Sequence, residues 1–221
     1  MKKKTYSIFF VLFAFSLFFA TSCLNNDDDE VEIDEEWKAL NDTRFNQAAA
    51  DASLTGLESQ TGGGKVYWKK STVITDSDNP SASIRVTVTG KPEFTDTVGV
   101  RYEGWYFNKD GDKVIFDSTE NESLTSTING TGNPNKETRY LAVNPATTSS
   151  SSNNYIGGMI EGWSTLIQDM VTGEERDVCI PYVLAYGGTA RTSSNYVVIP
   201  AYTTLWFRIK LIKIYPMKGL S

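Results

Sequence analysis

The side chains that most often carry catalysis are scarce in this sequence. Its 221 residues include no histidine, which excludes Ser–His and Cys–His nucleophilic sites and any histidine-ligated zinc site. The two cysteines are Cys23 and Cys179. Alternation along a strand-like run places Cys179 opposite Val178 and Ile180, so we interpret it as a structural thiol rather than a reactive one. Any chemistry must therefore use other groups.

Two glycine-containing segments resemble binding loops but lack residues that such loops need. Residues 108–112 (Asn-Lys-Asp-Gly-Asp) suggest a calcium loop, yet the glycine comes too early for an EF-hand and no glutamate closes the loop. We predict a hairpin turn there instead. Residues 62–64 (Gly-Gly-Gly) are not followed by the Lys-Ser/Thr of a phosphate loop, and we predict a linker. We expect neither a bound metal nor another cofactor.

The first 23 residues have the three parts of an export signal. Lysines at positions 2–4 precede an apolar run at 8–20, which is too short to span a bilayer comfortably. Residues 20–23 (Ala-Thr-Ser-Cys) resemble a bacterial lipobox with alanine where leucine is usual. We predict that residues 1–22 are removed and that Cys23 carries a lipid, which would anchor the chain to a bacterial membrane in the cell envelope, with the outer membrane favoured. An ordinary signal peptide with an incidental cysteine is the alternative.

Acidic residues are concentrated behind this cysteine, and the chain has a formal net charge of −6. Residues 23–33 cannot bury a core, and we predict that they form an acidic tether. In some Gram-negative lineages such a stretch resembles a surface-export signal, and a plain spacer is an equally good interpretation. The chain has no basic stripe that could follow a phosphate backbone, so we expect no nucleic-acid partner.

Beyond the tether the sequence predicts a helix and then a sheet. Large apolar residues spaced three to five apart predict one helix over residues 34–57. With the glycine linker it forms an N-terminal extension at 34–64, and the rest, 65–216, is predicted to be one sheet-rich domain. Residues 120–134 and 146–154 are rich in Ser, Thr, Asn and Gly and are predicted to be loops.

The sheet-rich part has the two-residue periodicity of strands. The clearest alternation opposes Val98 and Val100 to Arg101 and Glu103. Such half-buried strands are typical of an antiparallel sheet with one covered face, and a short helix predicted at 161–169 is the obvious cover. The predicted strands are residues 65–74, 83–89, 97–107, 113–117, 138–143, 174–180 and 203–214.

Three separated segments combine glycines, aromatic residues and a few polar residues. Their motifs, in chain order, are Val98-Gly99-Val100-Arg101-Tyr102-Glu103-Gly104-Trp105, Asp110-Gly111, Phe116-Asp117-Ser118, Ile160-Glu161-Gly162-Trp163, Met170, Gly173-Glu174, Ile180-Pro181, Leu184-Ala185-Tyr186-Gly187, Val198-Ile199-Pro200 and Thr204-Leu205-Trp206-Phe207. In order and spacing, these motifs resemble the FKBP family of peptidyl-prolyl cis-trans isomerases. The resemblance covers residues 98–214.

This resemblance implies an α+β fold, in which a twisted antiparallel β-sheet wraps around one short helix, with the N-terminal helical extension added. A ligand pocket would lie between the helix and the sheet. The resemblance assigns catalysis to Asp117, whose carboxylate would lie near the rotating amide, and to Tyr186, whose hydroxyl would donate to a substrate carbonyl. Trp163 would form the pocket floor, and Ile160 would offer its backbone N–H. The other implied substrate-binding residues are Tyr102, Phe116, Tyr140, Ile199 and Phe207.

A site of this kind needs no nucleophile, base, metal or cofactor. Rotation about an X-Pro bond crosses a barrier of ~18–20 kcal/mol that amide resonance sets. The planar amide is more dipolar than the twisted one, so water stabilises the ground state more, and a dry aromatic pocket removes that advantage. Lowering the barrier by ~5 kcal/mol would accelerate rotation several thousandfold. The expected partners are proline-containing polypeptides, here exported proteins, and macrolide inhibitors of the FKBP family.

Two other functions fit the same sequence. One is a catalytically weak binding module or chaperone on this fold, and the other is a surface adhesin or glycan-binding lipoprotein with exposed Trp105 and Trp206. The spans 116–160 and 187–198 are longer than is usual in the family, and both would flank the mouth of the pocket. Aromatic residues at alternating strand positions are also common in plain cores, which is the competing interpretation of Phe207. Trp163 of the predicted short helix could likewise be a plain core residue.

Overall fold

The computed structural model describes residues 33–74, 90–119, 138–146, 148–151, 154–194 and 196–217. All of them belong to one unit, Ile33–Ser221. The predicted export signal, Cys23, the acidic tether, the strand at 83–89 and the loop at 120–134 lie outside the described residues.

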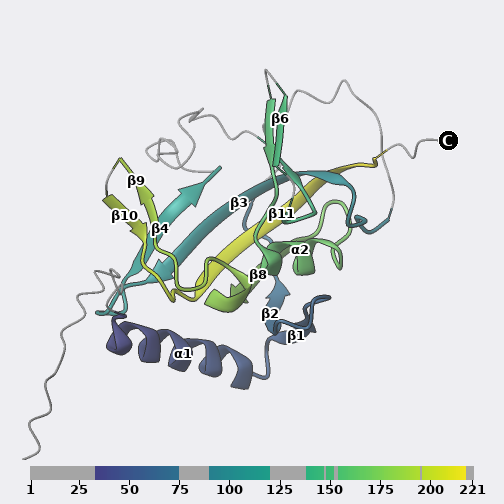
Figure 1. Ribbon diagram of the computed structural model, residues 1–221. Coiled ribbons are helices and arrows are strands. Elements are labelled where there is room, and N and C mark those ends of the chain that lie inside the picture. The colour runs from purple at the N-terminus through teal and green to yellow at the C-terminus, as the bar shows by residue number, and fades with distance from the viewer. Residues whose placement is uncertain are drawn as a thin grey trace, which may run out of the picture. The chain divides into compact units, whose positions relative to one another are not determined.

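An antiparallel sheet organises the described chain (Figure 1). Its strands, in spatial order, are β1 (Thr55–Glu58), β2 (Lys65–Lys70), β8 (Glu175–Ile180), β11 (Leu205–Tyr215), β3 (Thr97–Phe107) and β4 (Lys113–Ser118), and β5 (Arg139–Ala142) also pairs with β3. β4 pairs with the second half of β3 and β5 with the first half. The long strand β3 therefore has β11 along one edge and two short partners along the other.

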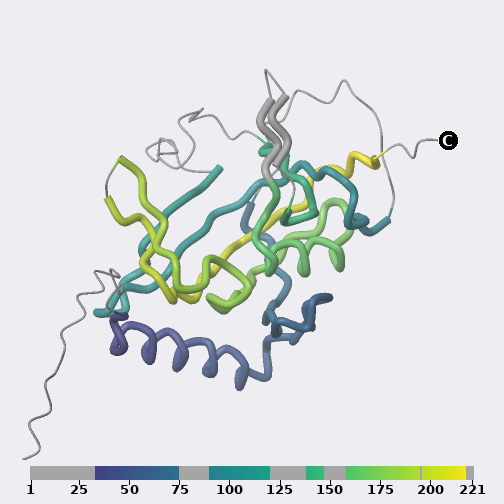
Figure 2. Tube along the Cα trace, viewed as in Figure 1, coloured from purple at the N-terminus to yellow at the C-terminus, as the bar shows by residue number. Residues whose placement is uncertain are grey.

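The core lies on one face of this sheet. In the register of β11 and β3, Ile209 lies opposite Tyr102, and both are buried. Helix α2 (Glu161–Ile167) packs on this face, where a Cβ on Gly162 would collide with Ile180 of β8, so only glycine allows the helix to approach so closely. Figure 2 traces β3 and β11 as neighbouring tubes that run the length of the sheet. The predicted α+β class, a sheet around one short helix with a helix near the N-terminus, is confirmed.

The N-terminal helix and the glycine linker differ from their predictions. Helix α1 (Glu35–Ala50), capped by the carboxylate of Asp34, ends before the predicted limit at residue 57. The chain then enters β1, which pairs with β2 across a turn in which Gly62 and Gly64 have φ values of 74° and 142°. The predicted linker is therefore a hairpin turn, and the extension contributes a strand to the sheet.

The region predicted as a loop at 146–154 and the long span at 187–198 each contain part of a hairpin. The pairs are β6 (Thr148–Ser151) with β7 (Asn154–Gly157), and β9 (Arg191–Ser193) with β10 (Tyr196–Ile199). Strands this short, and rich in Ser and Thr, present too few alternating apolar positions to be told from loops. The prediction of an irregular loop at 146–154 is thus wrong for its described part, and the long span 187–198 is a short β-ribbon.

The hairpin turn predicted at 108–112 is confirmed. The N–H of Asn108 donates to the carbonyl of Asp112 at 2.9 Å, and Gly111 adopts a φ of 90°. Among the described residues, no group of three or more Cys, Asp or Glu side chains is placed to hold a metal ion. None of the helices described is both long and apolar enough to cross a membrane.

Candidate active site

Four aromatic rings form a continuous series between α2 and the sheet. The ring centroids of Tyr102 and Trp163 are 4.9 Å apart, those of Trp163 and Phe207 are 5.1 Å apart, and those of Phe207 and Phe116 are 5.5 Å apart. Each neighbouring pair meets edge to face, at 87° to 88° between planes, which is a favoured arrangement of aromatic rings. All four residues are buried. They come from β3, α2, β11 and β4, so the series exists only in the folded chain.

A glycine in β3 makes room for two of these rings. A Cβ on Gly104 would lie 2.6 Å from Cε1 of Phe207 and 2.8 Å from Cζ of Phe116. These distances are shorter than van der Waals contact, so any side chain at this position would push the rings apart. The strand pairing is also irregular here, because β3 and β4 change register between Gly104 and Trp105. This bulge lets Phe116 and Asp117 both reach the site from adjacent positions.

The carboxylate of Asp117 lies at the Tyr102 end of the ring series. The Tyr102 hydroxyl donates a hydrogen bond to Oδ2 of Asp117. The guanidinium of Arg139 donates from Nη1 to the same Oδ2 at 3.0 Å and to the Tyr102 oxygen at 2.7 Å. Among the described residues, none donates to Oδ1 of Asp117. The carboxylate is therefore held through one oxygen by a tyrosine hydroxyl and a guanidinium.

Two tyrosine hydroxyls at this end remain protonated at neutral pH. Burial raises the pKa of Tyr102 well above its usual value, the negative charge of Asp117 raises it further, and the positive charge of Arg139 opposes the shift. Burial also raises the pKa of Tyr186, with a smaller contribution from Asp117 and an opposing one from Arg191. Tyr186 also packs against the buried cluster that contains Tyr102 and Trp163. Both hydroxyls can act as hydrogen-bond donors at any physiological pH.

Two N–H groups near the rings are free to donate. Within the described chain, Nε1 of Trp163 is the buried side-chain nitrogen or oxygen without a hydrogen-bond partner. Ile160, the N-cap of α2, is half-buried against the core, and its backbone N–H donates to no described residue. Leaving a buried donor unpaired costs about 1–3 kcal/mol. Such groups call for an explanation, and a ligand that accepts the hydrogen bond is one.

Of the two remaining predicted site residues, Ile199 lies with the four aromatic rings and Tyr140 does not. Ile199 is 1% exposed and belongs to the same apolar cluster as the four rings. Tyr140 lies opposite Gly99, on the other face of β3 from Tyr102. Its ring packs against Tyr215 at 5.5 Å between centroids, and the residue is 47% exposed. The structure does not bring Tyr140 to the other site residues.

Arg139 is the site residue that the sequence analysis missed. It stands next to Tyr140 in β5, and side chains of adjacent strand residues point to opposite faces. When Tyr140 faces away from the rings, Arg139 faces toward them. The only sequence signal is its place in a predicted strand, where a single cation is normally interpreted as a solvent-facing residue.

Three other residues singled out from the sequence lie away from the rings. Cys179 of β8 is fully buried, and burial raises the pKa of its thiol, as expected for a structural residue. Trp105 is also buried, with the ammonium of Lys113 4.1 Å from the centre of its ring. Trp206 is half-buried, 6.2 Å from the ring of Phe107. The expectation of two exposed tryptophans was wrong, so the adhesin hypothesis loses this part of its support.

Comparison with known proteins relates part of this chain to a known family. Residues 144–212 match the family model described as FKBP-type peptidyl-prolyl cis-trans isomerase. This part of the chain is thus similar to an FKBP-type isomerase domain. The match includes α2 with Trp163, Tyr186, and the strands that carry Ile199 and Phe207. The part of the candidate site formed by β3, β4 and Arg139 lies before the matched range.

Solved structures extend the likeness of fold to most of the chain. A peptidyl-prolyl cis-trans isomerase from Pseudomonas syringae pv. tomato str. DC3000 aligns with a TM-score of 0.50 and 21% identity, over 84% of this chain and 98% of that one. FkpA from Escherichia coli aligns with a TM-score of 0.49 and 19% identity, over 82% of this chain and 61% of that one. At such identities the first alignment supports the FKBP-like fold and nothing finer. A search of curated protein sequences found no match to the chain.

Proposed function

We propose that this domain catalyses cis–trans isomerisation of X-Pro bonds in exported polypeptides at the aromatic site described above. The observation that carries the proposal is the end of the ring series, where Tyr102 and Arg139 fix the carboxylate of Asp117. Buried rings of this kind suit a pyrrolidine ring, and polar groups at their edge suit the amide next to it.

The proposed mechanism needs no covalent step. The prolyl ring enters among Trp163, Phe207 and Phe116, which shields the amide from water and weakens the preference for its planar, more dipolar form. The Tyr186 hydroxyl donates to the carbonyl of the residue before proline, and the carboxylate of Asp117 stabilises the twisted amide electrostatically. The unpaired N–H groups of Trp163 and Ile160 supply donors for the rest of the prolyl residue.

A kinetic assay on short peptides tests this function. A peptide enriched in the cis X-Pro form relaxes unaided over tens to hundreds of seconds, and we expect catalytic amounts of the protein to shorten this time in proportion to their concentration. A macrolide ligand of FKBP domains should suppress the effect. If the uncatalysed rate persists while peptide still binds, the domain is a binding module or chaperone and the isomerase proposal fails.

We also propose that the chain is exported and anchored in the cell envelope through a lipid on Cys23. Its support is the sequence of residues 1–23, with basic, apolar and small-residue parts before the cysteine. Two acyl chains at ~0.8 kcal/mol per buried CH₂ would hold the protein on a membrane without a spanning helix. The protein should partition into detergent, and Cys23→Ser should release it or leave it unprocessed, whereas Cys179→Ser should change neither. A wild-type protein that stays in the aqueous phase would rule out the anchor.

A further inference from the structure

An arginine lies beside the proposed catalytic tyrosine. Arg191 opens β9, and its Cα pairs across the β-ribbon with Ile199, a proposed wall of the site. Its guanidinium carbon is 4.9 Å from the centre of the Tyr186 ring. Stacking on an aromatic ring holds the planar group in place while leaving its N–H donors free. Arg191 is nevertheless exposed, so it can meet a ligand from solution.

The charge of this arginine has no counterpart in the site. Of the charged groups around Tyr102 and Tyr186, Asp117 is already paired with Arg139 at 3.0 Å. Arg191 forms no ion pair with any carboxylate in the described part of the chain. A chain with a net charge of −6 therefore presents an uncompensated positive charge at the edge of its site.

We propose that Arg191 is a specificity-determining residue that selects substrates with Asp or Glu immediately before the proline. This inference rests on the proposed function, in which the Tyr186 hydroxyl holds the carbonyl of that preceding residue. Because the guanidinium of Arg191 lies over the Tyr186 ring, it is near the residue whose carbonyl this hydroxyl holds. Arginine presents paired N–H donors that match a carboxylate, and stacking on the tyrosine reduces the entropy lost when the pair forms.

The expected size of the effect follows from the exposure of the arginine. Solvent-exposed ion pairs favour association by about two- to fivefold at low salt, and salt screening should reduce this preference as ionic strength rises toward 1 M. We therefore expect a Glu-Pro peptide to exceed the isosteric Gln-Pro peptide in kcat/KM and in affinity by about this factor, and a Lys-Pro peptide to fall below both.

The test compares Glu-Pro, Gln-Pro and Lys-Pro peptides of otherwise identical sequence on the wild type and four variants. Arg191→Gln should bring the Glu/Gln ratio to about one, Arg191→Glu should reverse the order so that Lys-Pro is favoured, and Arg191→Lys should keep a reduced acidic preference. Lys70→Gln removes the same charge from an exposed position on β2 and should leave every ratio as in the wild type.

Two readouts separate this inference from the proposed function. Isomerisation rates give kcat/KM, and tryptophan fluorescence of the protein gives peptide affinity without turnover. Equal values for Glu-Pro and Gln-Pro in the wild type, or a preference that survives in Arg191→Gln, would overturn the role of Arg191. The wild type could also bind the Glu-Pro peptide selectively through Arg191 and yet accelerate none of the peptides. This result would disprove the isomerase function and support the selection of acidic residues by Arg191.

Discussion

Individual residues contribute to the proposed site in two different ways. Asp117 and Tyr186 present polar groups at the edge of the rings, and their substitution by isosteric residues changes hydrogen bonding without changing volume. Phe207 fills space between Trp163 and Phe116, so its loss opens a cavity in the core. These two kinds of residue should give different kinetic results when they are changed.

We expect Asp117→Asn and Tyr186→Phe to lower kcat with little change in KM. A hydrogen bond to the transition state is worth ~1–3 kcal/mol, or about five- to 150-fold in rate, whereas the apolar rings supply the uniform part of binding. Phe207→Ala should instead impair binding and lower the free energy of unfolding by ~3–5 kcal/mol. The measurements are kcat and KM on an X-Pro peptide, with thermal midpoints for each variant.

Matched controls come from exposed residues of the same types. Asp110→Asn lies in the turn after β3, and Tyr196→Phe lies in β10, where the tyrosine is 78% exposed. Both should behave as the wild type in rate and in stability. Wild-type turnover in Asp117→Asn and Tyr186→Phe as well would remove both residues from the mechanism.

At the scale of residues, the sequence predicted which side chains form the site better than it predicted the strand register that orients them. Tyr102, Phe116, Trp163, Ile199 and Phe207 converge in the structure because each lies in a motif with a fixed spacing. Tyr140 and Arg139 exchange their expected orientations, since a shift of one residue in a strand moves every side chain to the other face. β5 is short and follows a long span without a recognisable motif, so nothing in the sequence sets its register.

Among the elements, α1 is joined to the start of β11 by a buried polar contact. Asn41 is 1% exposed, and its Oδ1 accepts the backbone N–H of Thr204 at 2.9 Å. The Thr204 hydroxyl donates in return to the Asn41 carbonyl at 3.1 Å. Because Thr204 lies three residues before Phe207, this contact connects the helix to a strand of the site.

Replacing this asparagine should destabilise the fold. Asn41→Ala leaves the N–H of Thr204 buried without an acceptor, which costs about 1–3 kcal/mol. The measurement is urea unfolding, with the change seen as a lower midpoint at an unchanged slope. Asn46→Ala, on the exposed side of the same helix, controls for helix propensity. Equal midpoints for the two variants would mean that the contact contributes nothing measurable.

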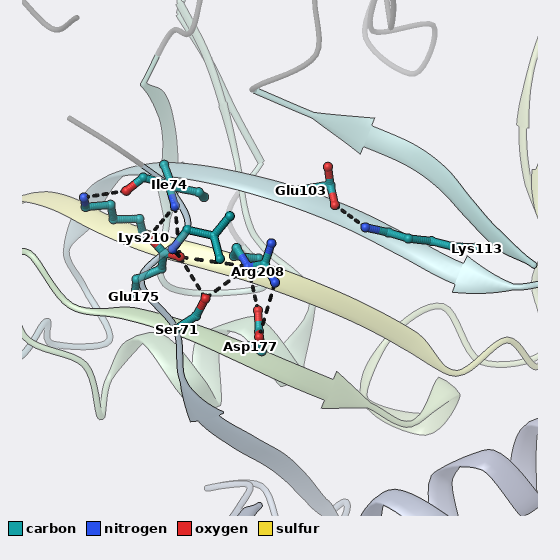
Figure 3. A network of polar contacts seen from close by, with 9 residues as sticks. Ser71, Ile74, Glu103, Lys113, Glu175, Asp177, Arg208 and Lys210 are labelled. Atoms are coloured by element: carbon teal, nitrogen blue, oxygen red, sulfur yellow. Dashed lines mark hydrogen bonds and ion pairs between the residues drawn. The ribbon is translucent and has the colours of Figure 1, made fainter. Parts of the chain in front are cut away.

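A second contact holds the segment after β2 against the sheet (Figure 3). The carboxylate of Glu175 accepts the N–H groups of Val73 and Ile74 and the hydroxyl of Ser71, at 2.6 to 3.1 Å. The ammonium of Lys210 donates to the carbonyl of Ile74 at 2.9 Å. Glu175 and Lys210 are both buried, so backbone groups take the place of water around their charges, and the guanidinium of Arg208 lies 3.9 Å from the Glu175 carboxylate.

We expect Glu175→Gln to loosen this segment without unfolding the domain. An amide would place N–H donors opposite backbone N–H groups, and the lost acceptor is worth ~1.5–3 kcal/mol. The amides of Val73 and Ile74 should then exchange about ten- to 150-fold faster, while the central amides of β11 keep their protection. Glu58→Gln, at an exposed position on β1, is the control. Unchanged exchange at Val73 would contradict the role given to Glu175.

The strands were predictable from the sequence where apolar and polar residues alternate over several positions. The predicted bounds of β3 agree with the structure, and β4, β8 and β11 agree closely, because each has several residues that alternate between a buried and a polar face. β1 was missed because Leu57 was included in a helical pattern. The segment held by Glu175 could not be foreseen, because it depends on partners about a hundred positions away in the chain.

On the scale of the whole molecule, the sheet has half-buried polar contacts on the face away from the rings. Arg208 of β11 pairs with Asp177 of β8 at 2.8 Å, directly across the strand pairing. Cys179 is buried on the same face of β8, since it alternates with Val178 of the core. The periodicity of the sequence indicates which residues share a face, but what covers a face depends on long-range packing that periodicity does not encode.

Burial of ionisable groups in this fold should make it less stable at alkaline pH. Burial raises the pKa of both Cys179 and Tyr102 in the native state, whereas the unfolded groups ionise near about 8.5 and 10. The unfolded chain therefore releases these protons first, so the contribution is fully present below pH ~8.5 and is lost as pH rises, by up to ~1.4 kcal/mol per pH unit for each group. Between pH ~8.5 and 9.5 the cysteine dominates, because tyrosine has not yet ionised.

The variant Cys179→Ala tests this role of the thiol. We expect its free energy of unfolding to be lower than that of the wild type at pH ~8.5, because the substitution leaves a cavity. Between pH ~8.5 and 9.5 its free energy of unfolding should fall less steeply than that of the wild type, as measured by urea unfolding at several pH values. Parallel curves for the variant and the wild type would show that the buried thiol is not the group that senses alkaline pH.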